Sequence, residues 1–192
     1  MDKKNLLPKD GELYYYPNFL GKEAENHLFD VLKQGSLWEQ EEIKLFGKRL
    51  KSPRLTSYYG TKAYTYSSVP HPPKAYPKVI LELMARIESE HRLGFNSVLL
   101  NFYRDGQDSM GWHQDNEGVL GKNPAIASIN LGATRKFSFK HCTDKQAKVN
   151  VLLEGGSLLL MKGSIQHYWK HQLPKTSLPV GERINLTFRC IV

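Results

Sequence analysis

The feature of this sequence that most constrains its fold is a change in the spacing of apolar residues near residue 97. Before that point apolar side chains recur at helical spacing, as at Ile80, Leu83, Met84 and Ile87. After it, apolar and polar residues alternate with the period of a β-strand. The alternating runs are short and lie at residues 97–103, 125–131, 136–140, 149–153, 157–161 and 183–191. Helices followed by many short strands predict a mainly β fold, a sandwich or jelly roll with flanking helices.

Several elements are also expected in the first half of the chain. One helix is predicted over residues 21–34, ending at Gly35, and a second helix begins at Pro77. Residues 43–47 are expected to form a strand that enters a turn. The Tyr- and Thr-rich segment 54–66 predicts a strand, a turn around Gly60 and a second strand. The proline-rich segment 69–73 predicts a stiff connector.

Length and composition bound the class of protein. A chain of 192 residues corresponds to one domain, and 40% hydrophobic with 24% charged residues is typical of globular proteins. No run approaches the roughly 18 apolar residues of a membrane span, and no signal-peptide core follows the first residues. The two cysteines, Cys142 and Cys190, form no CxxC zinc motif. We therefore expect a monomer that does not bind membranes, in the cytoplasm or, in a eukaryote, the nucleus.

The charge balance points to an anionic partner. Lysine and arginine number 27 against 19 acidic residues, which gives a formal net charge of +8, and ten tyrosines contribute to the 11% of aromatic residues. A basic surface rich in tyrosine suits a polyanion whose bases can stack, which means a nucleic acid. The alternative is a basic protein whose lysines are only solvated.

A short motif carries the first chemical indication. His113 and Asp115 are separated by one residue on or beside a predicted strand, so their side chains are expected to point to the same face. A third ligand is available from either His167 or His171. Two histidines and one carboxylate with open metal positions form the facial triad of non-haem iron(II) oxygenases. A zinc hydrolase with the same ligand set is an alternative.

The C-terminal strand adds a second indication. Alternation over residues 183–191 places one set of side chains in the core and a polar set on the opposite face, namely Arg183, Asn185, Thr187 and Arg189. This polar face is either exposed to solvent or buried against an anion. A buried arginine needs an anionic partner, and its forked guanidinium matches a carboxylate. The second interpretation therefore predicts a bound dicarboxylate.

Together these motifs resemble the AlkB family of iron(II)- and 2-oxoglutarate-dependent dioxygenases. The matching segments are residues 101–103 (NFY), 113–117 (HQDNE), 126–128 (IAS), 171–174 (HQLP) and 183–189 (RINLTFR). The last segment matches the family's Arg-x-Asn-Leu-Thr-Phe-Arg pattern in full. The resemblance implies a single dioxygenase domain over 1–192 with a double-stranded β-helix, or jelly-roll, core. Residues 96–192 would form this catalytic core, and residues 1–95 the N-terminal helices and a nucleotide-recognition lid.

The resemblance also implies the cofactors and their ligands. Iron(II) would be bound by His113, Asp115 and His171, while His167 would be structural. The implied 2-oxoglutarate-binding residues are Asn101, Tyr103, Arg183, Asn185, Thr187 and Arg189. In this assignment Arg189 grips the far carboxylate of 2-oxoglutarate, and Arg183 assists at the co-substrate and metal site. Molecular oxygen is the remaining reactant.

The implied reaction is the oxidative demethylation of N1-methyladenine and N3-methylcytosine in DNA, with release of formaldehyde and conversion of 2-oxoglutarate to succinate. Four residues match positions that hold the nucleic acid in relatives. Tyr66 would stack on the flipped base, Glu117 would read the base edge, and Phe46 would enter the base stack as an apolar wedge. Arg54 would contact the DNA. Phe46 and Tyr66 also fit ordinary packing positions in a sheet.

Two departures leave the form of the substrate open. The segment 141–149 is shorter than the matching segment of duplex-acting relatives. The basic cluster that follows the Leu-Pro pair in those relatives is reduced here to Lys175. Single- and double-stranded DNA are therefore both expected partners. The candidate phosphate contacts are Lys44, Lys48, Arg49, Lys51, Lys136 and Lys140. The alternatives are an RNA demethylase, a protein oxygenase on the same iron core, and a basic nucleic-acid-binding module without enzymatic activity.

Overall fold

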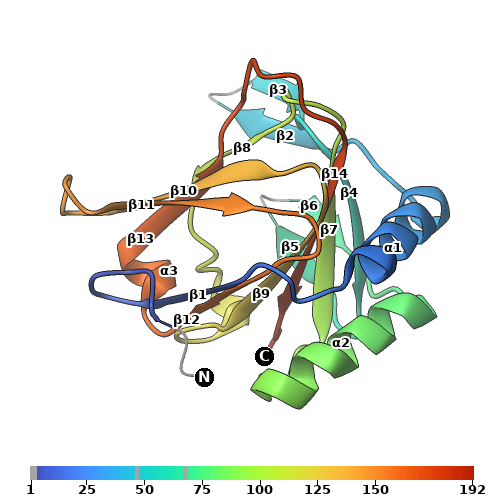
Figure 1. The fold of residues 1–192 in the computed structure, drawn as a ribbon, viewed down its shortest axis with the longest axis horizontal. Coiled ribbons are helices and arrows are strands. Elements are labelled where there is room, and N and C mark those ends of the chain that lie inside the picture. The colour runs from blue at the N-terminus through green and yellow to red at the C-terminus, as the bar shows by residue number, and fades with distance from the viewer. Residues whose placement is uncertain (1–3, 46–47, 67–68) are drawn as a thin grey trace.

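Two antiparallel sheets face each other in the computed structural model, which describes residues 4–45, 48–66 and 69–192 (Figure 1). For residues 43–45, 48–49, 64–66 and 69 the description covers the backbone alone. The larger sheet has the strand order β1 (Glu12–Tyr16), β12 (Leu158–Lys162), β9 (Ile126–Gly132), β14 (Arg183–Arg189), β7 (Ser97–Tyr103) and β4 (Leu55–Gly60). The smaller sheet has the order β11 (Lys148–Leu153), β10 (Arg135–His141), β13 (Trp169–Leu173) and β8 (Met110–His113).

From β7 onward the chain crosses repeatedly between the two sheets, which is the connectivity of a jelly roll. The chain passes from β7 in the larger sheet to β8 in the smaller one, returns to β9, and crosses again to the β10–β11 hairpin. It then returns to β12, crosses to β13 and ends in β14. The expected fold class, a mainly β protein with a double-stranded β-helix core, is confirmed.

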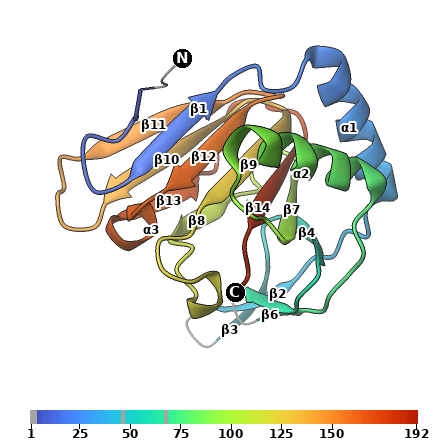
Figure 2. The same cartoon turned by 90° about the horizontal axis from the view of Figure 1, so that it is seen from below.

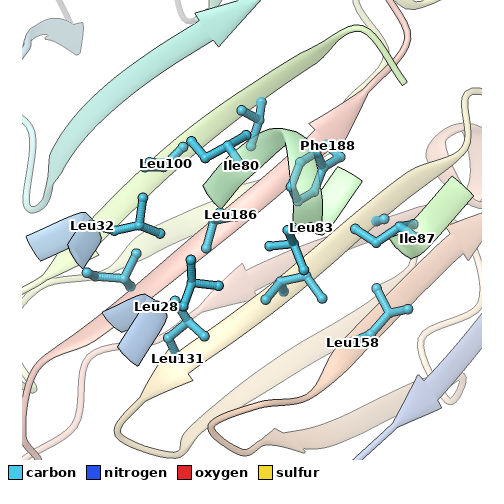
Figure 3. Packing of buried hydrophobic residues seen from close by; sticks show 14 of the residues in the cluster. Leu28, Leu32, Ile80, Leu83, Ile87, Leu100, Leu131, Leu158, Leu186 and Phe188 are labelled. Atoms are coloured by element: carbon cyan, nitrogen blue, oxygen red, sulfur yellow. The ribbon is translucent and has the colours of Figure 1, made fainter. Parts of the chain in front are cut away.

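Two helices cover the outer face of the larger sheet. Helix α1 (Lys22–Gly35) and helix α2 (Lys78–His91) lie on the same side of the molecule in both views (Figures 1 and 2). Their apolar faces pack onto β7, β9, β12 and β14 (Figure 3). The labelled members of this core are Leu28, Leu32, Ile80, Leu83, Ile87, Leu100, Leu131, Leu158, Leu186 and Phe188.

Both helices and the C-terminal strand agree with the sequence prediction to within one or two residues. The sequence prediction missed several elements, namely β1, β3 (Lys48–Lys51), the single-turn helices η1 (Gly118–Leu120) and α3 (Ile165–Tyr168), and β13. The expected connector over residues 69–73 is wrong, because β6 (Val69–His71) pairs with β5 (Tyr64–Tyr66). A proline is tolerated there because the hairpin has only two strands, so each strand is an edge.

The other strands predicted in this region are present among the described residues, and the structure shows which of them pair. Of the strand and turn expected over residues 43–47, residues 43–45 lie in β2 (Glu42–Leu45), which pairs with β3 (Lys48–Lys51), and residues 46–47 lie outside the described residues. Segment 54–66 forms two strands on either side of a bend after Gly60, as expected, but the two do not pair, since β4 joins the larger sheet and β5 pairs with β6. Tyr- and Thr-rich sequence indicates strands but does not specify which strands pair.

The N-terminal half of the chain contributes to the core sheet as well as to the two small hairpins. Strands β1 and β4, the two edges of the larger sheet, both come from residues 1–95. The sheet therefore crosses the boundary expected between residues 95 and 96. The nucleotide-recognition lid expected within residues 1–95 stays a prediction. Of the helices built from the described residues, none combines the length and apolar content required to span a bilayer.

The packing of β14 under the helices gives a direct test of this core. Leu186 is 0% exposed, whereas Leu178 is 69% exposed. We expect Leu186→Ala to lower the free energy of unfolding by about 3 kcal/mol, through lost burial and a residual cavity. Leu178→Ala should change it by less than about 0.5 kcal/mol. Urea denaturation followed by circular dichroism measures both, and equal effects would contradict the assignment of the core.

Candidate metal centre and active site

The space between the two sheets is apolar at one end and polar at the other. The apolar end contains Leu13, Phe139, Leu159 and Trp169 from both sheets. The polar end is a pocket lined by side chains of both sheets, including Asn101, Tyr103, His113, Asp115, Ser128, His171, Arg183, Asn185, Thr187 and Arg189. Chemistry that needs charged groups and shelter from water is therefore confined to the second end.

Three potential metal ligands meet in this pocket. His171 in β13 lies directly opposite His113 at the end of β8, and their ring centroids are 4.2 Å apart. Asp115 follows β8 by two residues, and one ligand atom from each of the three lies within 4.8 Å of the others. His167 lies in α3 and is not part of this group. The group is the one expected, but Asp115 reaches it from a loop because β8 ends at His113.

The hydrogen bonds of the three side chains leave ligand atoms available for a cation. The Nδ1 atom of His113 donates to the Gly111 carbonyl at 2.8 Å, and its Nε2 lies 3.7 Å from Asp115 Oδ1. Asp115 Oδ2 accepts from Arg189 Nη2 at 2.7 Å and from Nε at 3.2 Å. Within the described part of the chain, buried Asp115 Oδ1 and His171 Nδ1 have no hydrogen-bond partner. Unpartnered buried polar atoms are rare, and two imidazoles with one carboxylate oxygen fit iron(II).

The protonation states also suit metal binding. Burial lowers the pKa of His171 to about 3 and lowers that of His113 below its usual value. Burial alone would raise the pKa of Asp115, but the Arg189 guanidinium and the two histidines hold it well below its usual range. At neutral pH both imidazoles are therefore neutral and the carboxylate is ionised, as metal ligands must be.

One positioning residue, Gln166, was missed by the sequence analysis. It is 0% exposed in α3, and its Oε1 accepts the backbone N–H of Asp115 at 2.9 Å. Its own carbonyl accepts from Gln114 Nε2 at 2.8 Å. Because α3 leads directly into β13, Gln166 links the loop of one ligand to the strand of another. An isolated glutamine contacting backbone has no recognisable sequence pattern, so no signal marked it.

The polar face of β14 is buried, so the interpretation of this face as solvent-exposed is wrong. Its four polar side chains, Arg183, Asn185, Thr187 and Arg189, are 2–8% exposed. Asn185 lies opposite Asn101 on β7 and opposite Asn130 on β9, and its Nδ2 donates to Ser128 Oγ at 2.7 Å. This row forms a continuous polar wall beside the metal ligands.

Arg183 is a buried cation at the end of that wall. Its guanidinium lies over the Tyr103 ring, 5.0 Å from the centroid, and Nη2 donates to Asn130 Oδ1. Its Nε has no hydrogen-bond partner, and no carboxylate of residues 4–45, 48–66 or 69–192 forms an ion pair with it. Burial lowers the pKa of Arg183 to about 10, so the group remains charged at neutral pH. An unpaired buried charge is costly, which favours an anionic ligand at this position.

Arg54, which was expected to contact the DNA, lies in the interior of the fold. Its side chain is 5% exposed and lines the same pocket. Nε donates to Asn101 Oδ1 at 2.6 Å, and Nη1 lies 3.1 Å from Met110 Sδ. These contacts direct the guanidinium into the pocket, and its contact with DNA stays a prediction.

The remaining substrate residues stay predictions. Glu117 is half-buried at the start of the single-turn helix η1 (Gly118–Leu120), two residues after Asp115. Tyr66 ends β5, where the description covers the backbone alone. Phe46 lies outside the described residues.

A jelly roll with two histidines and a carboxylate at one end of its interior defines a class of metal-dependent oxygenases. A family model described as the 2OG-Fe(II) oxygenase superfamily matches residues 12–189 of this chain. The chain belongs to this superfamily, and its relatives place it among the AlkB-like dioxygenases. The cofactors of the superfamily are iron(II), 2-oxoglutarate and molecular oxygen, and the His113, Asp115 and His171 cluster is a candidate iron site.

The relatives of this chain are named as AlkB homologues. The rat "Alpha-ketoglutarate-dependent dioxygenase alkB homolog 3" is 37% identical over 185 residues, which is 92% of this chain but 63% of the relative. The human "DNA oxidative demethylase ALKBH2" is 33% identical, covering 92% of this chain and 72% of that protein. This chain thus spans less than two thirds of the length of the alkB homolog 3 proteins it matches. A solved structure of OsALKBH1 has the same fold, with a TM-score of 0.65 and 20% identity over 93% of this chain and 97% of that chain.

The lowered histidine pKa values predict how metal affinity depends on pH. Ligand histidines with ordinary pKa values would both become protonated below pH ~6.5, weakening binding about 100-fold between pH ~7.5 and ~5.5. Because burial lowers the pKa of both His113 and His171, we expect a loss of less than about tenfold over that range. Cobalt(II) titration followed by visible absorption measures this, with His113→Ala as the control for binding elsewhere. A loss near 100-fold would contradict the expectation.

Proposed function

We propose that this protein removes N-linked methyl groups from bases in DNA in an iron(II)- and 2-oxoglutarate-dependent oxidation. The proposed lesions are N1-methyladenine and N3-methylcytosine, and the products are the repaired base, formaldehyde, succinate and carbon dioxide. The observation that carries the proposal is the pocket itself, where three metal ligands lie beside a buried arginine that lacks an anion. The printed names of the relatives support the nucleic-acid substrate.

In this proposal His113, Asp115 and His171 hold the iron. When bound, iron would couple the oxidative decarboxylation of 2-oxoglutarate by molecular oxygen to hydroxylation of the N-methyl carbon, and the resulting hemiaminal would break down to formaldehyde and the repaired base. Arg189 keeps Asp115 ionised and fixes its Oδ2, so that Oδ1 is directed to the metal. Gln166 holds the backbone of Asp115 in the same position.

The contacts of the two arginines favour an exchange of the roles first expected for them. Arg189 is already in contact with a metal ligand, so it acts at the metal end of the pocket. Arg183 has an unpartnered Nε, so we assign the far carboxylate of 2-oxoglutarate to it. Tyr103 lies under its guanidinium, and Asn101 and Asn185 line the same wall. Thr187 donates to Asn185 Oδ1 at 2.9 Å and thereby orients that amide.

The base would enter the same pocket beside the iron. An enzyme that oxidises a base must take it out of the stack, and a base methylated on its pairing edge is flipped at lower cost. We propose that Arg54, held by Asn101, forms part of the pocket wall that meets the nucleotide. Glu117 is proposed to read the base edge, Tyr66 to stack on it and Phe46 to fill the gap in the duplex. We propose that the protein acts as a monomer in the cytoplasm or the nucleus.

The test of this function is a repair assay on matched oligonucleotides. The protein is incubated with iron(II), 2-oxoglutarate, ascorbate and oxygen, with single- and double-stranded DNA carrying one N1-methyladenine, and with the same lesion in RNA. Mass spectrometry follows the base and succinate. We expect loss of the methyl group only when 2-oxoglutarate is present, and loss of turnover in His113→Ala and Asp115→Ala. Succinate without demethylation would redirect the search to a protein or other substrate. No product from a metal-loaded protein would contradict the enzymatic function.

The roles assigned to the two arginines predict different defects. Arg183→Lys keeps the charge but loses the fork that binds a carboxylate, so the apparent KM for 2-oxoglutarate should rise about tenfold or more. Arg189→Lys should instead weaken cobalt(II) binding about tenfold, since it frees the metal-ligating carboxylate. Steady-state succinate formation and cobalt titration separate these effects. The opposite pairing of defects would restore the roles first expected.

A further inference from the structure

The outer face of the smaller sheet carries a set of lysines around an exposed tryptophan. On β8, β10, β11 and β13, the inward side chains include Phe139, Val151, Trp169 and His171. The alternate side chains point outward, away from the pocket. We call the outward residues Trp112, Lys136, Lys140, Lys148 and Lys170 the outer basic face.

The charge of this face is uncompensated. The four strands contain five basic residues, Arg135 and these four lysines, and no aspartate or glutamate. Lys140 lies directly opposite Lys148 on one side and Lys170 on the other. Like charges at directly opposed positions destabilise a sheet. None of the four lysines forms an ion pair with any acidic group in the ranges that the structure describes.

This face is also open, in contrast to the outer face of the larger sheet. Helices α1 and α2 cover the larger sheet on the side of the molecule away from β10 and β11 (Figures 1 and 2). On the smaller sheet Lys136, Lys148 and Lys170 are exposed. A positive, open sheet face has the charge complementary to a phosphate backbone.

Trp112 joins this face to the candidate active site. It is 38% exposed and immediately precedes His113, so neighbouring residues serve the pocket and the outer face. The Lys140 ammonium lies 4.3 Å from the centroid of the Trp112 ring. Strand β8 is an edge of its sheet, so a chain leaving the pocket can pass over this edge and meet Trp112 first. Lys170 and Lys140 lie on the next two strands.

We propose that the outer basic face binds the single-stranded nucleic acid that flanks the base in the pocket. Trp112 stacks on an unpaired base, and Lys140, Lys148 and Lys170 contact phosphates. The inference rests on the proposed function for the identity of the nucleic acid in the pocket. A single strand is favoured over a duplex because an aromatic platform needs a base with a free face, which paired and stacked bases do not offer.

The test is salt-dependent binding of an unmethylated thymidine oligomer of about 20 nucleotides to the whole protein, followed by fluorescence anisotropy. K148Q/K170Q removes two lysines and leaves the contact between Lys140 and Trp112 in place. K78Q/R92Q, on and just after α2, removes the same charge from exposed positions on the other side of the molecule. Each lost phosphate contact should lower the slope of log affinity against log salt by about 0.7, so K148Q/K170Q should lower it by about 1.4. The control pair should leave it unchanged.

Tryptophan fluorescence gives a second readout. Trp169 is fully buried and Trp38 packs on Phe102, so quenching by the oligomer should come from Trp112 and be lost in Trp112→Leu. The same binding measurement is made with a uridine oligomer and with a DNA duplex of the same length. Equal loss in both double variants, an unchanged slope in K148Q/K170Q, or tighter binding of duplex than of single strand would overturn the proposal. Because the probe is unmethylated and needs no iron, absence of demethylation would not affect this result.

Discussion

The strict alternation of β14 at the centre of the larger sheet is the constraint on which the rest of the structure depends. Its even-numbered residues, Ile184, Leu186 and Phe188, pack under the two helices, and its odd-numbered residues line the pocket. Pairing with β7 and β9 on both sides fixes its register. A slip of one residue would bury two guanidiniums under the helices and turn leucine and phenylalanine into the pocket. Core packing and site chemistry are therefore specified by the same seven residues.

The site concentrates charge where water is excluded. Asp115, Arg183 and Arg189 are each less than 5% exposed. The ion pair between Asp115 and Arg189 offsets part of the free-energy cost of burying these two charges. The buried charge of Arg183 is stabilised only by the Tyr103 ring and the Asn130 amide among the described residues. Binding of a metal and of a dicarboxylate would supply the missing counter-charges. The stability of this fold and its capacity for ligands are thus linked.

The sequence predicts the fold class, the two helices and β14 because these depend on local periodicity. The resemblance implied the metal cluster through short motifs, and the structure brings those three side chains together. The inward direction of Arg54 and the role of Gln166 were not predictable, since both depend on contacts between segments distant in sequence. The same holds for the outer basic face. Its lysines are scattered along the chain, and only the strand order brings them onto one surface.

The contact between Arg189 and Asp115 has a consequence for coordination number. Because Arg189 occupies Oδ2, Asp115 offers a single oxygen, and each imidazole offers a single nitrogen. The protein would therefore offer a cation three ligand atoms, with the carboxylate binding through one oxygen only. An octahedral cation bound this way keeps half of its coordination sphere for molecules that arrive from solution.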